Sequence, residues 1–69
     1  MSTSIYTVTG MTCQHCVASV TTEVSRLDHV TAVEVDLDAG KVTVESTESI
    51  PEQAVIDAIQ EAGYSAVAS

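Results

Sequence analysis

The stretch VTAVEVDLDAGKVTVE, residues 30–45, predicts a β-hairpin from which the rest of the fold can be worked out. Apolar and polar residues alternate on both sides of a central Asp-Ala-Gly, which is the period-two pattern of half-buried strands. We therefore expect strands over residues 30–37 and 41–45. Gly40 completes the turn between them, because glycine adopts positive φ without a steric penalty. The inward-facing residues of the two strands are Val33, Val35, Leu37, Val42 and Val44.

After the hairpin, apolar residues recur at helical spacing and predict a helix followed by a short strand. We expect Ser49 to be the N-cap of this helix, with Glu52 three residues later completing a capping box. Pro51 is acceptable in the first turn, because its missing N–H would have no partner there. Gly63 ends the helix as its C′ residue, and residues 64–68 suffice for a closing strand. The inner face of the helix contains Val55, Ile56, Ala58, Ile59 and Ala62.

Before the hairpin, the chain predicts a strand and another helix. Residues 4–9 are rich in β-branched and aromatic side chains, with Tyr6 and Val8 on one face. A helix is expected from Gln14 to about Arg26. Valine is a mediocre helix former, so tertiary packing must stabilise this segment. Its inner face contains Val17, Val20, Val24 and Leu27.

The resulting order, strand–helix–strand twice over, is the ferredoxin-like βαββαβ arrangement. We expect an α+β sandwich in which a four-stranded antiparallel sheet carries two helices on one face. A chain of 69 residues is one domain, residues 1–69. The two halves differ in one respect: the first helix begins with two cysteines, and the second begins with an ordinary cap. Folding does not require those cysteines, so the first half carries the function.

The composition limits the possible partners. Ten acidic residues against two basic ones give a formal net charge of −8 and a pI near 4.1. The negative electrostatic potential of such a chain repels nucleic acid and anionic lipid. The charge promotes either solubility or docking onto a basic patch of a protein. No apolar run approaches the ~20 residues that span a bilayer, and the N-terminus lacks a secretory pattern. We therefore expect a cytoplasmic protein without membrane insertion, in a reducing compartment.

The only two cysteines, Cys13 and Cys16, lie at the start of the first predicted helix. Their spacing places both sulfurs on one side of the helix N-terminus, where backbone N–H groups lack partners and the helix dipole is positive. Both effects favour the thiolate, which is the form of cysteine that binds metals and attacks disulfides. The pair is therefore activated, whichever chemistry it serves.

Three kinds of site use such a pair. A structural zinc site needs four ligands, and this chain adds only His15, on a tight turn, and His29, far along the helix. A thioredoxin-type redox pair also begins a helix, but here no tryptophan flanks the pair and the only proline is Pro51. A Cu(I) ion is satisfied by two thiolates and can accept a third sulfur from a partner. The residues favour copper and leave redox chemistry open.

The stretch GMTCQHC, with the βαββαβ order around it, resembles the heavy-metal-associated (HMA) domain of copper chaperones and copper-transporting P-type ATPases. It looks most like the free-standing bacterial chaperones of the CopZ type. The family's pattern G-M-x-C-x-x-C is matched at Gly10, Met11, Cys13 and Cys16. The resemblance also includes the stretches DAGKVTV (38–44) and IQEAGYSA (59–66).

This resemblance implies that Cys13 and Cys16 are the Cu(I) ligands. Met11 corresponds to a buried methionine that packs beneath the loop without binding metal. Tyr64 corresponds to a tyrosine near the site of bacterial members, although it also fits an ordinary core aromatic after a helix. Relatives selective for zinc or cadmium carry aspartate directly before the first cysteine, so Thr12 at that position favours copper.

Neither histidine receives a ligand role. His15 is either a solvated loop side chain or a residue whose charge tunes the thiolates, and we expect tuning or contact with a partner. His29 is expected to be an exposed loop residue.

The expected function is that of a cytoplasmic copper chaperone, which is not an enzyme. It would bind Cu(I) through two thiolates and transfer it by ligand exchange to the metal-binding domain of a copper-transporting P-type ATPase. A copper-responsive regulator is a second class of partner, and two facing cysteine pairs predict a copper-bridged homodimer. The alternatives are a thiol-disulfide redox protein, or the handling of another soft metal: mercury, zinc or cadmium.

Overall fold

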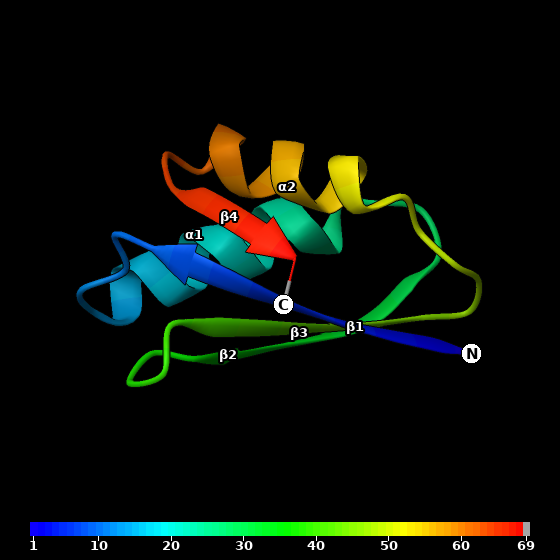
Figure 1. Cartoon of the computed structure of the whole chain (residues 1–69), viewed down its shortest axis with the longest axis horizontal. Helices are drawn as coiled ribbons and strands as arrows, with labels where there is room; N and C mark the ends of the chain where they lie inside the picture. Colours follow the sequence, from blue (N-terminus) through cyan, green and yellow to red (C-terminus); the bar gives the residue numbers. More distant parts are fainter. Residues whose placement is uncertain (69) are drawn as a thin grey trace.

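A computed structural model describes residues 1–68 and shows the predicted order of elements. A single antiparallel sheet has the strand order β2-β3-β1-β4, and both helices cover one of its faces (Figure 1). The expected α+β, ferredoxin-like fold is therefore confirmed. Ser69, the last residue of the predicted domain, lies outside the described residues. The elements are β1 (Ser2–Thr9), α1 (Gln14–Ser25), β2 (Val30–Asp36), β3 (Lys41–Ser46), α2 (Glu52–Glu61) and β4 (Ser65–Ala68).

The β2–β3 hairpin pairs residues that were predicted to face inward. Val33 lies opposite Val44, and Val35 lies opposite Val42. The two β3 residues are buried, and their β2 partners pack half-buried against the same core. Gly40 has a φ of +67°, so the turn uses the positive φ that glycine permits.

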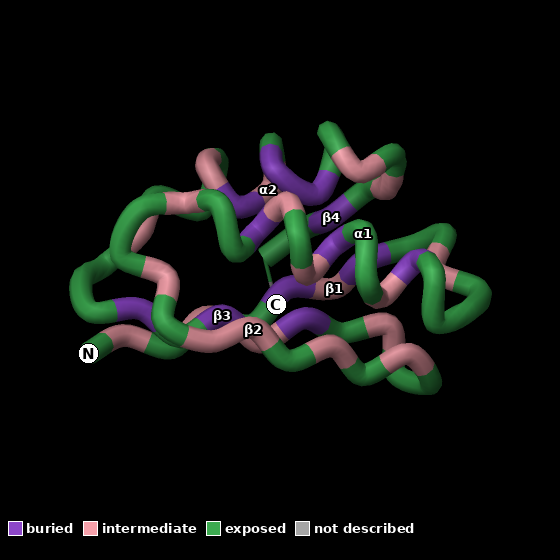
Figure 2. The backbone as a smooth tube through the Cα atoms, turned by 180° about the vertical axis from the view of Figure 1, so that it is seen from behind, coloured by how far each residue is buried: buried purple, intermediate pink, exposed green. Residues whose placement is uncertain are grey.

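The core lies between the helices and the inner face of the sheet, where the buried segments of Figure 2 face one another. It is almost entirely aliphatic, as expected for a chain with two tyrosines and no Phe or Trp. Burial of apolar side chains from both layers is what holds α1 and α2 on the sheet. The buried cluster consists of Tyr6, Val8, Val20, Val24, Val42, Val44, Val55, Ala58, Ile59 and Ala66.

The predicted capping box of α2 is wrong. Pro51 is the N-cap residue, with φ −56° and ψ 134°, and no side chain caps the helix by a hydrogen bond. A Ser49 N-cap would require Ile50 to be helical, but a residue that precedes proline is disfavoured in the α region. The helix therefore begins two residues later than the sequence pattern predicts, at Glu52.

The C-terminal end of α2 is a Schellman motif. Gly63 has a φ of +95°, and its N–H donates to the Gln60 carbonyl at 2.9 Å. The Tyr64 N–H donates to the Ile59 carbonyl at 3.2 Å. These two bonds satisfy helix carbonyls and confirm Gly63 as the C′ residue. They also fix the backbone of Tyr64 as it enters β4.

Neither helix in residues 1–68 is long and apolar enough to cross a membrane.

Candidate metal centre

The cysteine pair lies where β1 ends and α1 begins. Cys13 is the N-cap residue, with an extended backbone, and the helix begins at Gln14. The backbone N–H of Cys16 donates to the Cys13 carbonyl at 3.1 Å and closes the first turn. Both cysteines are free thiols, and their Sγ atoms lie 3.8 Å apart. The two sulfurs therefore lie together at the helix N-terminus, as their spacing predicts.

The two sulfur-bearing residues differ in accessibility. Cys13 is exposed, whereas Cys16 retains only 9% of its accessible surface. An incoming group can therefore reach Cys13 directly, while the scaffold holds Cys16 in place. This asymmetry suits a site that must both hold an ion and release it to another molecule.

Hydrogen bonds favour the thiolate of Cys16 and lower its pKa from an ordinary value of 9.0 to about 6. The largest contribution comes from the backbone of Thr12, followed by the Tyr64 hydroxyl and the backbone of Cys13; burial opposes them. The Thr12 Oγ1 also lies 3.9 Å from the Cys16 sulfur. At neutral pH, Cys16 is therefore mostly a thiolate, the form that binds soft metals.

Tyr64 reaches the pair from the other end of the chain. β4 pairs with β1 in a register that sets Thr9 opposite Ser65. The next residues outward, Gly10 and Tyr64, consequently face one another. Hydrogen bonding to the Cys16 thiolate, together with burial, raises the pKa of Tyr64. The sequence resemblance suggested a tyrosine near the site, but the strand register explains why it lies there.

Met11 and His15 lie close to the cysteine pair in sequence, but their surroundings differ. Met11 is half-buried and packs against the hydrophobic core. His15 is exposed in the first turn of α1, between the two cysteines. The structure thus packs Met11 against the core and leaves His15 facing solvent. A tuning role for His15 stays a prediction.

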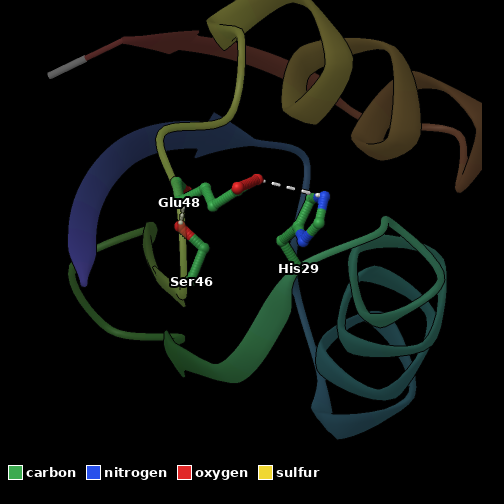
Figure 3. Close-up of polar contacts among 3 residues, drawn as sticks. All are labelled: His29, Ser46 and Glu48. Carbon is green, nitrogen blue, oxygen red and sulfur yellow. Dashed lines mark hydrogen bonds and ion pairs between the residues drawn. The ribbon is translucent and has the colours of Figure 1, made fainter.

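His29 lies beyond the C-terminal end of α1, away from the cysteines at its N-terminal end. Its Nε2 atom lies 3.3 Å from a carboxylate oxygen of Glu48, and a dashed line marks this contact in Figure 3. The Ser46 hydroxyl donates to the Glu48 carbonyl at 2.6 Å, which orders the same connection. His29 is exposed as predicted, but its φ of +73° and its contact with Glu48 had no sequence signal. Within residues 1–68, no three His, Cys, Asp or Glu side chains converge to hold a metal ion.

Comparison with known proteins gives consistent results. Residues 5–65 match the family described as the heavy-metal-associated domain. The chain is 48% identical over 58 residues to the copper chaperone CopZ of Bacillus subtilis (strain 168), covering 83% of this chain and 84% of that protein. A solved CopZ metallochaperone is 36% identical, with a TM-score of 0.90, over 96% of this chain and all of that one. A copper binding domain from a P-type ATPase is 27% identical, with a TM-score of 0.92, over 100% and 95% of the two chains.

Proposed function

Because this chain belongs to the heavy-metal-associated domain family, we propose that it is a copper chaperone that carries Cu(I) between the thiolates of Cys13 and Cys16. The observation that carries the proposal is the sulfur pair itself. Its Sγ atoms are 3.8 Å apart at a helix N-terminus, Cys16 is favoured as a thiolate, and Cys13 is exposed. Similarity to CopZ chaperones supports copper as the cargo.

The proposed chemistry depends on charge and softness. Thiolates are soft ligands that select Cu(I) over metals preferring oxygen, and a d¹⁰ ion accepts two of them. Two thiolates and Cu(I) leave one net negative charge, which the N-terminus of α1 partly offsets. Met11 packs against the hydrophobic core and Tyr64 favours the thiolate of Cys16, so neither needs to bind the ion. His15 is proposed to tune the thiolates or to contact a partner.

Transfer is proposed to proceed by ligand exchange without redox change. A thiolate of the recipient binds the copper beside the exposed Cys13, and one thiolate of this chain then leaves. Copper remains Cu(I) throughout, and each sulfur bond that breaks is replaced by one that forms. The protein is a carrier and not an enzyme, because no covalent bond of a substrate is made or broken.

The proposed recipient is the metal-binding domain of a copper-transporting P-type ATPase. The likeness to such a domain supports this choice, since donor and acceptor would then present equivalent sites. We place this exchange in the cytoplasm, with residues 1–69 acting as a single domain. A copper-responsive regulator is a second recipient, and two chains sharing one ion would form a copper-bridged homodimer.

The transfer experiment uses a recipient domain that carries its own cysteine pair. The Cu(I)-loaded chain is mixed with this apo domain and an excess of a Cu(I) chelator, and the acidic chain is separated by anion exchange. We expect copper to reach the recipient faster than the chelator removes it from the chain alone. A recipient with serines in place of its cysteines is the control. Equal rates of copper loss with either recipient would contradict direct transfer.

A thiol-disulfide exchange function is the second candidate, because a 3.8 Å sulfur pair with a lowered Cys16 pKa also suits disulfide chemistry. Fast reduction of insulin by the dithiol form, together with weak Cu(I) binding, would favour it. Parallel chelator competitions with Cu(I), Hg(II), Zn(II) and Cd(II) rank the soft metals in the same preparation.

A further inference from the structure

One side of β1 is only partly covered by a neighbouring strand. β3 pairs with β1 from Ser2 to Thr7, whereas β4 pairs with its other side only from Tyr6 to Thr9. In Figure 1 the arrow of β4 therefore ends near the middle of β1, and the N-terminal half of β1 continues past it. Among residues 1–68, no strand pairs with residues 2–5 on this side, so these residues form an open edge of the sheet.

The open edge has backbone groups available for a further strand. The Val8 N–H donates to the Gly40 carbonyl, on the β3 side of β1, at 2.7 Å. Successive residues of a strand direct their backbone N–H and C=O groups to alternate sides, so those of Thr3 and Ile5 point toward the β4 side. The described part of β4 ends before it reaches either residue. An added strand can therefore bond to both.

The open edge also lacks the features that keep sheet edges from pairing. Charged side chains, prolines and β-bulges oppose the addition of a strand. On the opposite edge of the sheet, β2 carries exposed Glu34 and Asp36 and a register shift between Val30 and Ala32. The open edge has the sequence STSI, without charge or proline, and its pairing with β3 is regular. It can therefore accept a strand, whereas β2 resists one.

A groove at the open edge is bordered by β1, the end of β4 and the start of α2. Its lining residues are Thr3, Ser4, Ile5, Tyr6, Glu52 and Ala68. The exposed large apolar side chains among residues 1–68, Met1, Ile5 and Val67, all belong to these two strands or directly precede them. Ile5 and Val67 alternate with buried neighbours, so both lie on the sheet face opposite to the helices.

The charged side chains around the groove favour a cationic partner. Glu52 lines the groove, and the exposed Glu45 of β3 lies opposite Thr3. Neither basic side chain of the chain lines it: Lys41 begins β3 beside the hairpin turn, and Arg26 forms an ion pair at the end of α1. A second copy of this chain, with its net charge of −8, is repelled.

We propose that the open edge is a docking site for an extended, cationic segment of a partner protein, which adds to the sheet as a strand beside β1. Backbone hydrogen bonds to Thr3 and Ile5 hold the segment. Because side chains alternate along a strand, its apolar residues cover Ile5 and Val67 while a lysine or arginine approaches Glu52 on the helix side. The cysteine pair follows the other end of β1, so this site is separate from the sulfurs.

The test uses the metal-free chain and the synthetic peptide acetyl-Thr-Val-Lys-Val-Lys-Val-Thr-amide, with amide hydrogen exchange followed by NMR. When about nine-tenths of the chain carries the peptide, exchange at Thr3 and Ile5 should slow about tenfold, since only the free chain exchanges. The amides of β2 should exchange at an unchanged rate. Unchanged exchange at Thr3 and Ile5 at the highest soluble peptide concentration would overturn the proposal. Equal slowing by a peptide with glutamate in place of lysine would also overturn it.

Two matched variants test the role of charge. Glu52→Gln should weaken peptide binding about two- to fivefold, which corresponds to one exposed ion pair. Glu61→Gln makes the same change in net charge at the other end of α2 and should bind like the wild type. Equal weakening in both variants would indicate non-specific attraction and contradict the proposal.

A peptide-free dilution series tests the other occupant. Exchange at Thr3 and Ile5 should not depend on the concentration of the chain. Slower exchange at higher concentration would identify a second copy as the occupant and overturn the proposal. No measurement in this set involves copper, so its outcome is independent of the proposed copper function.

Discussion

Replacing Cys13 or Cys16 by serine is expected to abolish tight Cu(I) binding. Each change exchanges a soft thiolate for a hydroxyl that a soft ion does not select, and it leaves one sulfur where two are needed. Residues that merely support metal ligands cost about 10- to 100-fold in affinity when changed, so the loss of a ligand should exceed about 100-fold.

The measurement is a competition for Cu(I) against a high-affinity chelator under reducing conditions. His15→Ala is the matched control, because His15 lies between the two cysteines and is exposed. We expect this variant to keep tight binding with a moderate change in affinity, which would reveal the tuning role. Wild-type competition by either serine variant would remove that cysteine from the site.

The reactivity of Cys16 should depend on pH around a midpoint near 6. Its pKa is about 6, so the thiolate dominates above this pH and is protonated below it. In a Cys13→Ser background, the rate of alkylation should approach a plateau above neutral pH. Below pH 6 it should fall by roughly tenfold for each unit, since only the thiolate reacts.

Mass spectrometry of the alkylated chain gives this profile directly. Tyr64→Phe should move the midpoint upward, because the tyrosine hydroxyl is the second largest cause of the lowered pKa. A midpoint at the ordinary cysteine value of 9.0 in the parent variant would show that the hydrogen bonds from Thr12 and Tyr64 do not act on this sulfur.

Local patterns predicted most of the fold. The hairpin was predictable because alternation and a glycine turn agree, and both helices were predictable from their apolar spacing. The start of α2 was not, because two local rules conflict there. The Ser-x-x-Glu pattern favours a cap at Ser49, and the restriction that Pro51 places on Ile50 is the stronger effect.

The candidate site was predictable only in part. Cys13 and Cys16 are close in sequence, so their spacing alone brings the sulfurs together at the helix start. The position of Tyr64 at the end of β4 depends on the pairing of β1 with β4, which is a long-range feature. The same holds for Gly10, whose motif position is visible in the sequence but whose closeness to the Tyr64 ring is visible only in three dimensions.

The proposed copper function requires that the sulfurs of Cys13 and Cys16 hold Cu(I). Copper K-edge X-ray absorption of the Cu(I)-loaded chain tests it most directly, because this method identifies the atoms bonded to the metal. We expect a shell of sulfur atoms alone: two when a single chain holds the ion, and more when a second chain shares it. A shell that contains nitrogen from His15, or oxygen in place of either sulfur, would contradict it.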